Sequence, residues 1–237
     1  MPKVSTVTLS SVLDAREVTL PNFDKQYLDD VSFVTAMTLV LMGNYCQTGH
    51  FGGPLAYTPY TVASHLIGPD LGGLKYDYRR PKHPYSDKFM LAGGHNAPVT
   101  YALWMVLGEA LYRKYENTGN KKYLADYDQT LLPIDCIGFR RSKRGMESIL
   151  SENGLSDHPA MQQAKIRGIR ALSGHSESTD VTNDVNGGPS GIGIATAAGK
   201  ATFWDIIGAS DSPKIMAVEG EFAMTSGHSQ EMKTQAV

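Results

Sequence analysis

The segment from 187 to 231 constrains the fold more strongly than any other part of the chain. It opens with a glycine-rich turn, GGPSGIG, which leads into a stretch made largely of alanine and other small residues. A short apolar run follows at 215–218, and it ends on the acidic triplet at 219–221. Small residues let a helix pack closely on a sheet, and acidic residues after a buried parallel strand lie where open α/β sheets bind their ligands. The segment therefore predicts a helix beginning near Gly191, a parallel strand at 215–218 and a ligand site beyond that strand.

The composition fits one large α/β domain with a well-buried core. The chain has 237 residues and a formal net charge of −2, and that length is sufficient for such a core. The near-neutral charge gives no electrostatic reason to bind nucleic acid or an anionic membrane. Two cysteines are too few for a disulfide framework, so we expect a reduced, cytoplasmic setting. No apolar run in the sequence is long enough to span a bilayer.

Two parts of unequal size are expected along the chain. Residues 1–23 lack helical periodicity and contain two prolines, so they are expected to form an extended arm. Residues 24–237 are expected to form the α/β domain. The residues from Glu231 onward are interpreted as the first turns of a helix, and the sequence stops inside it. We therefore expect a domain that is truncated at its C-terminal end, or one chain of a split protein.

Apolar periodicity predicts alternating helices and strands. Helices are expected from Asp24, over 55–67 and over 98–115, with a polar loop at 69–87. The run at 89–92 is typical of a buried parallel strand. Together with the strand at 215–218, these elements predict a parallel, mostly buried sheet with helices on both faces. The apolar face of the first helix is expected to include Leu28, Val31, Val34, Thr35, Thr38 and Leu41.

Three histidines follow glycines at points where the chain is expected to turn. His50 lies in GHFGGPL, His95 follows the strand at 89–92, and His175 lies in SGHSE. Glycine permits a sharp turn that exposes the imidazole, and a pKa near neutrality suits histidine to proton transfer. Each histidine can equally cap its own turn, so the spacing alone leaves open whether the three share one site.

Taken together, these motifs resemble the N-terminal, diphosphate-binding domain of transketolase and its thiamine-diphosphate relatives. The resemblance runs from about Asp24 to the end of the sequence, with the motifs in the family's order. The three glycine-histidine motifs resemble the family's histidine segments. The turn at 188–193 resembles its glycine turn, and the triplet at 219–221 stands where the family has its acidic-glycine metal motif. Each motif alone is weak, whereas five in register are specific.

The resemblance implies separate roles for the three histidines, which are predicted to converge on one cleft with Gly188 and Glu219. His50 and His175 would face the substrate as catalytic residues. His95 would bind the cofactor, either at a phosphate oxygen or beside the thiazolium. The implied cofactors are thiamine diphosphate and a divalent cation, Mg²⁺ or Ca²⁺.

The glycine turn and the acidic triplet would complete the cofactor site. By the resemblance, Gly188 and Ser190 would lie against the aminopyrimidine, and Gly220 and Glu221 would also belong to the cofactor-binding set. Glu219 would be the metal ligand, because hard divalent cations prefer oxygen ligands and take few carboxylates when phosphate oxygens are present.

The sequence departs from the family pattern at several positions. Glu219 stands where aspartate is usual, Ser190 replaces an apolar residue, and Ser226 stands where a glutamate is usual. The family's asparagine-containing metal motif would lie beyond residue 237, and the pyrimidine-binding domain is not in this sequence. The chain alone is therefore not expected to be a complete catalyst.

Three functions remain open. The favoured one is transketolase-like transfer of a two-carbon ketol unit from a ketose, or its phosphate, to an aldose. This chain would supply the diphosphate- and metal-binding half, within a homodimer or beside a second chain that carries the pyrimidine-binding domain. The long segment before His175 keeps a pyruvate-type 2-oxo acid dehydrogenase component open. Glu219 and Ser190 keep open a degenerate, non-catalytic partner subunit.

Overall fold

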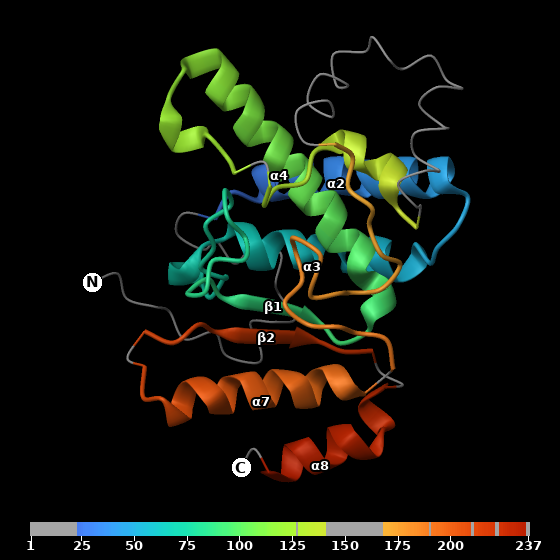
Figure 1. The fold of residues 1–237 in the computed structure, drawn as a ribbon, viewed down its shortest axis with the longest axis vertical. Helices are drawn as coiled ribbons and strands as arrows, with labels where there is room; N and C mark the ends of the chain where they lie inside the picture. Colours follow the sequence, from blue (N-terminus) through green and yellow to red (C-terminus); the bar gives the residue numbers. More distant parts are fainter. Residues whose placement is uncertain are drawn as a thin grey trace.

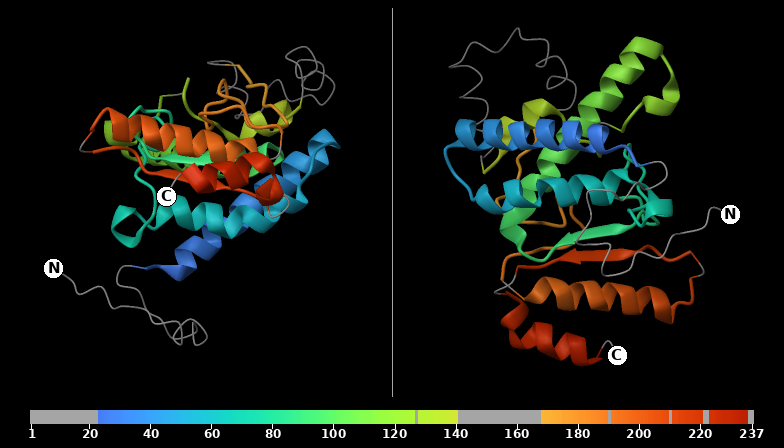
Figure 2. Two further views of the ribbon diagram at one scale, coloured as in Figure 1. Left: turned by 90° about the horizontal axis from the view of Figure 1, so that it is seen from below. Right: turned by 180° about the vertical axis from the view of Figure 1, so that it is seen from behind.

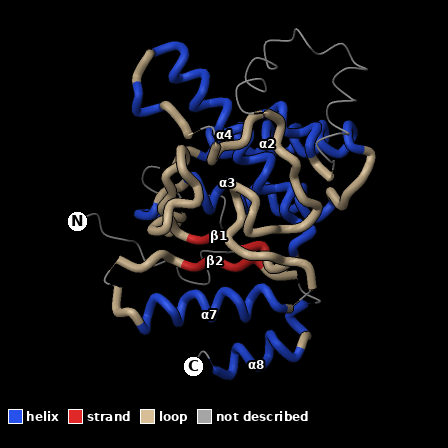
Figure 3. Tube along the Cα trace, in the orientation of Figure 1, coloured by secondary structure: helices blue, strands red, loops and turns tan. Residues whose placement is uncertain are grey.

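Helices make up most of the described structure, with a small parallel sheet between them (Figure 3). The computed structural model describes residues 23–126, 128–140, 168–189, 191–209, 211–220 and 223–235. No helix within these ranges is both long and apolar enough to cross a membrane. The main helices and strands of these ranges are α2 (Lys25–Cys46), α3 (Gly52–Leu66), β1 (Lys88–Leu91), α4 (Ala97–Thr118), α7 (Ile192–Ile206), β2 (Ile215–Val218) and α8 (Gly227–Gln235).

The two strands pair in parallel, which confirms that both predicted strands lie in one sheet. Lys88 is opposite Ile215, and the register continues to Leu91 opposite Val218. β1 is buried throughout, whereas the four residues of β2 are only half-buried. The expectation of a mostly buried sheet therefore holds for β1 and is wrong for β2. In the described ranges no further strand pairs with the outer edge of β2.

Helices pack against the strands from two sides. Phe89 and Leu91 of β1 belong to a buried cluster with Val99 and Ala102 of α4. On the opposite side, α7 approaches so closely that a Cβ on its Gly193 would overlap Ala92. Figures 1 and 2 show the resulting order: α2, α3 and α4 lie on one side of the strands, and α7 followed by α8 on the other. The result is a mixed α/β arrangement that is mostly helical.

The first three helices begin and end at residues with clear local causes. The carboxylate of Asp24 accepts a hydrogen bond from the backbone N–H of Tyr27 at 2.9 Å and caps α2, as predicted. α3 begins at Gly52 and not at 55, because a proline in the first turn, Pro54, has no N–H that needs a partner. α4 is longer than the predicted 98–115 and ends at Gly119, which adopts the left-handed conformation that glycine favours.

The predicted apolar face of α2 is partly wrong. Val34 and Leu41 are 47% and 60% exposed. Leu28 and Thr35 are buried as predicted, and the rest of the core side is formed by Leu39, Met42 and Cys46. Because α2 carries apolar residues on both sides, their spacing does not indicate which side faces the core.

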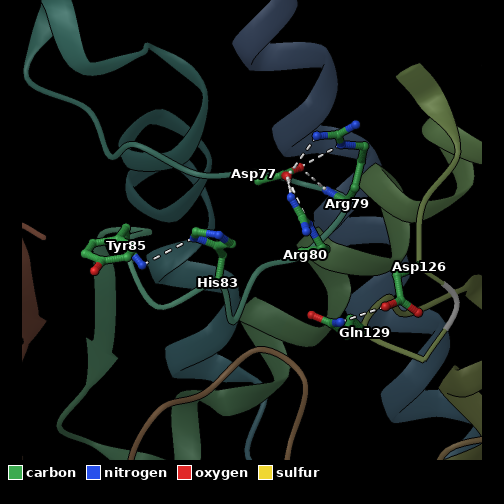
Figure 4. Close-up of polar contacts among 7 residues, drawn as sticks. All are labelled: Asp77, Arg79, Arg80, His83, Tyr85, Asp126 and Gln129. Carbon is green, nitrogen blue, oxygen red and sulfur yellow. Dashed lines mark hydrogen bonds and ion pairs between the residues drawn. The ribbon is translucent and has the colours of Figure 1, made fainter. Parts of the chain in front are cut away.

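The segment between α3 and β1 is a loop, as predicted, with one short 3₁₀ turn at Pro69–Leu71. Asp77 organises its middle. Its carboxylate accepts hydrogen bonds from Arg79 Nε at 2.9 Å and from Arg80 Nη2 at 3.3 Å (Figure 4). The hydrogen bonds from Arg79, more than any other contact, lower the pKa of Asp77 to about 2. This cluster fixes the path of the chain into β1.

The C-terminal elements agree with the sequence in part. The helix predicted near Gly191 is α7, which begins at the next residue. α8 begins at Gly227, four residues before the helix start predicted at Glu231. The hydroxyl of Ser226 accepts a hydrogen bond from the N–H of Ser229 at 3.3 Å, and this cap lets the helix start early. The predicted arm at 1–23 lies almost entirely outside the described residues.

Candidate functional site

Several segments meet at the carboxyl edge of the sheet. The backbone N–H of Ala92 donates to the carbonyl of Val218 at 2.9 Å, so the chain leaves β1 and β2 side by side. The turn after β1 leads directly into α4. The start of α7 lies at the same edge, because Gly193 packs on Ala92. Figure 1 shows both strand arrowheads pointing toward this end of the molecule, where α4, α7 and α8 begin.

Three histidines line one cleft at this edge. His50, His95 and His175 form its wall together with the backbone of 49–53. The rings of His50 and His95 lie with centroids 6.1 Å apart and planes at 86°. Within the described part of the chain, no hydrogen bond engages any of the three imidazoles. Their ring nitrogens are therefore available to a ligand.

The cleft favours the neutral form of His95. Burial lowers the pKa of this histidine, and the neighbouring His50 and His175 lower it further because like charges repel. A neutral imidazole has one donor nitrogen and one acceptor nitrogen, so it can both give and take a proton. The cleft is chemically suited to exchange protons with hydroxyl or carbonyl groups of a ligand.

Backbone hydrogen bonds fix the segment that carries His175. The N–H of Ser176 donates to the carbonyl of Gly94 at 3.0 Å, and its carbonyl accepts from the N–H of Gly187 at 2.7 Å. The backbones at Gly94 and Gly187 come so close that a Cβ on Gly94 would overlap the carbonyl oxygen of Gly187. The glycine turn before α7 is thereby held beside the turn that carries His95.

Two of the predicted cofactor residues, Gly188 and Gly220, are described by the structure, and two are not. Gly188 is exposed, and open space surrounds the position where a side chain would extend. The carbonyl of Gly220 accepts a hydrogen bond from the N–H of Met224 at 3.2 Å. As far as the chain is described, the wall of the histidine cleft includes neither glycine. Ser190 and Glu221 lie outside the described residues.

Glu219 follows β2 directly and has one carboxylate oxygen without a partner. Its Oε1 accepts a hydrogen bond from the N–H of Gly220 at 3.1 Å. Its Oε2 is buried and has no hydrogen-bond partner among the described residues. A buried carboxylate oxygen of this kind costs free energy unless a ligand satisfies it. Glu219 therefore fits the role of a cation ligand at the carboxyl edge.

The described residues do not form a metal site from protein side chains alone. In the ranges that the structure describes, no group of three or more His, Cys, Asp or Glu side chains gathers to hold an ion. Magnesium does not need such a group when it is bound through one or two carboxylates together with substrate phosphates and water. The donor set is therefore compatible with a cation that is bound jointly with a phosphate-bearing ligand.

Curated relatives match parts of the chain. Transketolase-like protein 2 of Mus musculus is 30% identical over 94 residues, which are 40% of this chain and 14% of that protein. Transketolase-like protein 2 of Homo sapiens is 44% identical over 36 residues, 15% of this chain and 6% of that protein. The chain thus spans only a small part of the length of these relatives. No protein-family model matches it.

Solved transketolases share the fold. A transketolase variant from Pichia stipitis matches with a TM-score of 0.56 and 20% identity, over 88% of this chain and 24% of that one. The chain is similar to transketolases, in sequence over part of its length and in fold over most of it. A Pichia stipitis transketolase in complex with sedoheptulose-7-phosphate gives the same values. Transketolase from Leishmania mexicana gives a TM-score of 0.52 at 20% identity, over 88% and 25% of the two chains. The matched part is about one domain of a transketolase.

Two polar residues beside the transketolase-like motifs were not predicted as site residues. Asn96 and Ser176 directly follow His95 and His175. Asn96 Oδ1 and Ser176 Oγ are buried without a hydrogen-bond partner among the described residues. A Cβ on Gly53 would overlap Asn96 Oδ1, so this amide lies directly behind the cleft wall. The sequence could have indicated both residues, because each is a polar residue directly after a glycine-histidine pair.

Proposed function

We propose that the chain forms the diphosphate- and metal-binding half of a transketolase-like enzyme, which transfers a two-carbon ketol unit from a ketose or ketose phosphate to an aldose. The observation that carries the proposal is the cleft lined by His50, His95 and His175 at the carboxyl edge of a parallel sheet, in a transketolase-related chain. A ketol unit has hydroxyl and carbonyl oxygens whose protons must move as its carbon–carbon bond breaks and forms. Three imidazoles whose nitrogens have no hydrogen-bond partner among the described residues suit that task.

Each histidine takes a separate part in this proposal. His50 and His175 bind sugar hydroxyls and exchange protons with them. His95, which its surroundings favour in the neutral form, donates to a phosphate oxygen of the cofactor or lies beside its thiazolium. The three come from separate segments, so their alignment depends on the close packing of Gly94 on Gly187.

The residues at the carboxyl edge fit thiamine diphosphate and Mg²⁺. Glu219 Oε2, buried and unpartnered among the described residues, would ligate the cation, and the open backbone at Gly188 would admit the aminopyrimidine. When bound, thiamine diphosphate supplies a carbanion and then an electron sink. The remaining proposed cofactor-binding residues are Ser190, Gly220 and Glu221.

The proposed assembly places residues 24–237 as one domain against a pyrimidine-binding domain, supplied by a second copy or a second chain. Phe203 and Ile206 of α7 are 55% and 77% exposed, and they line a groove with small residues of α7 and with α8. Exposed apolar patches favour contact with a partner. Light scattering of the full-length protein at micromolar concentration is expected to show a dimer or tight complex. A monodisperse monomer would argue against this assembly.

A non-catalytic partner subunit is the second candidate function. Its support is that Glu219 carries one methylene more than the aspartate usual in the family, and that Ser190 replaces an apolar residue of the glycine turn. A 2-oxo acid dehydrogenase component has less support, because much of the long segment before His175 lies outside the described residues.

The test uses the full-length protein with thiamine diphosphate and Mg²⁺. Transfer of a ketol unit from a ketose phosphate to an aldose is expected, without release of carbon dioxide from pyruvate. His50→Asn and His175→Asn should reduce turnover by roughly 10²- to 10⁴-fold while calorimetry still detects cofactor binding. His83→Asn, in the loop before β1, is the matched control. If the protein binds neither cofactor nor metal, the non-catalytic reading is correct.

A further inference from the structure

A buried tyrosine–carboxylate pair holds the segment that carries His175. Tyr101, on α4, is fully buried, and Asp180 is 7% exposed. The hydroxyl of Tyr101 donates to Oδ2 of Asp180. The same hydroxyl lies 3.5 Å from the carbonyl oxygen of His175. The pair thus links a core helix to the segment that forms one wall of the cleft.

Asp180 also accepts hydrogen bonds from residues that follow His175 in the chain. Its Oδ2 accepts a hydrogen bond from the N–H of Glu177 at 3.2 Å and lies 3.5 Å from Nδ2 of Asn183. The next residue toward His175 is Ser176, which hydrogen-bonds to Gly94 and Gly187 through its backbone. The backbone on either side of His175 is therefore held by the bonds of Ser176 to Gly94 and Gly187 and by the bond from Glu177 to Asp180.

Burying the carboxylate of Asp180 costs free energy that an apolar side chain in the same place would not cost. Burial raises its pKa, because removing a carboxylate from water disfavours the charged form. Apolar residues of similar volume often replace buried charged groups without loss of stability. A buried carboxylate whose hydrogen bonds are directed to the His175 segment indicates a task other than packing.

We infer that Asp180 and Tyr101 form a positioning pair, which holds the imidazole of His175 in the cleft toward His95. The part played by His175 in turnover rests on the proposed function, whereas the geometry of the pair does not. Asp180 acts through the Glu177 N–H, and Tyr101 acts through Asp180. Neither residue lines the described cleft wall, so both are positioning residues and neither is a catalytic one.

The test compares Tyr101→Phe, Asp180→Asn and Asp180→Leu with Tyr78→Phe in the full-length protein. Tyr78→Phe is the matched control, because its hydroxyl donates to the carbonyl of His65 in the core and not to the His175 segment. The first readout is the NMR titration of the His175 and His95 rings without ligand. Tyr101→Phe and Asp180→Leu should shift the His175 resonance and raise the pKa of His95, because His175 moves away from it. Asp180→Asn retains an acceptor oxygen and should give the smaller change.

The second readout is turnover with cofactor and sugar phosphate. Tyr101→Phe should lower kcat by on the order of 10- to 100-fold, because even a small misplacement of a reacting group lowers the rate strongly. KM should change less. If Tyr101→Phe and Asp180→Leu lower the unfolding midpoint as Tyr78→Phe does but leave both histidine titrations unchanged, the pair is structural only and the inference is wrong. If the titrations shift but the parent protein transfers no ketol unit, the positioning stands and the proposed function fails.

Discussion

The imidazole of His50 meets that of His95 edge to face, with ring centroids 6.1 Å apart and planes at 86°. His50 precedes α3 and His95 follows β1, so this contact joins two segments that are distant in sequence. His175 completes the cleft wall. The proximity couples the charge states of the rings, because a positive charge on one disfavours a second nearby. The pKa of His95 is lowered by burial first and by these neighbours second.

Replacing His50 with asparagine should raise the pKa of His95. The substitution removes one positive neighbour, while burial, the larger cause, remains. The His95 pKa should therefore rise and still lie below its ordinary value. NMR titration of the histidine rings measures this directly. His65, whose pKa burial lowers to about 4, lies in the core and should titrate unchanged. An unaltered His95 titration would show that the rings are not coupled.

Alanine should be tolerated at Gly52 and not at the adjacent Gly53. A Cβ on Gly52 would meet open space, whereas a Cβ on Gly53 would overlap Oδ1 of Asn96. Overpacking of this kind costs about 1–3 kcal/mol, so Gly53→Ala should lower the free energy of unfolding by that amount. Urea denaturation measures it. The double variant Gly53→Ala with Asn96→Ala should recover much of the loss, because the overlapping oxygen is gone. Equal destabilisation by Gly52→Ala would contradict the packing.

Helices and strands were predictable from the sequence where residues close together in the chain determine them. Asp24 caps α2 through a hydrogen bond to a residue three positions away, and such caps are visible in the sequence. The parallel pairing of β1 and β2 agrees with the prediction made from two short apolar runs, one followed by a glycine-rich turn and the other by an acidic triplet. The buried side of α2 was not predictable in this way, because the helix is apolar on both sides and only tertiary packing chooses one.

Most contacts between distant residues were beyond the reach of the sequence. The motifs and the resemblance predicted that the three histidines converge on one cleft with Gly188 and Glu219. The structure brings the three histidines to one cleft wall, which in the described ranges includes neither Gly188 nor Glu219. The bond between Tyr101 and Asp180 joins residues 79 positions apart, and no local pattern marks either one. The unpartnered oxygens of Asn96 and Ser176 likewise depend on what surrounds them. The proposed roles of Ser190 and Glu221 stay predictions.

Asp77 should make folding stability fall at acidic pH. Its folded pKa is lowered from 3.8 to about 2, chiefly by hydrogen bonds from Arg79. A carboxyl group whose folded pKa is depressed contributes stability above its unfolded pKa, and the contribution is lost as pH falls through the folded pKa. Denaturation between pH 5 and 2 should therefore show a smaller decline in Asp77→Asn than in the parent. Asp70→Asn, an exposed position of the same loop, controls for the loss of one charge. Identical declines in parent and Asp77→Asn would contradict the cluster in Figure 4.

Asp180 should have the opposite effect. Its folded pKa is raised above 3.8, chiefly by burial, so its contribution to stability is present below the unfolded pKa and is lost as pH rises through the folded pKa. Asp180→Asn should remove this part of the pH dependence, which makes the variant relatively more stable near neutrality than in acid. Chemical denaturation from pH 3 to 7 tests the sign. A variant that is most destabilised at neutral pH would show that the ionised carboxylate is stabilising.

Glu219 should support metal-dependent cofactor binding without supporting the fold. Its Oε2 is buried with no hydrogen-bond partner among the described residues, so Glu219→Gln breaks no described contact of that oxygen while keeping the shape of the side chain. The free energy of unfolding should stay equal or increase by on the order of 1 kcal/mol. Calorimetric titration of the full-length protein with thiamine diphosphate should show that Mg²⁺ strengthens binding to the parent and not to Glu219→Gln, and that chelation of Mg²⁺ makes the two alike.

Glu231→Gln in α8 is the control, because this glutamate lines the groove between α7 and α8 and not the carboxyl edge of the sheet. If Glu219→Gln binds cofactor and Mg²⁺ as the parent does, Glu219 is not the ligand. If Glu219→Asp binds more tightly than the parent, the extra methylene is a handicap for metal binding.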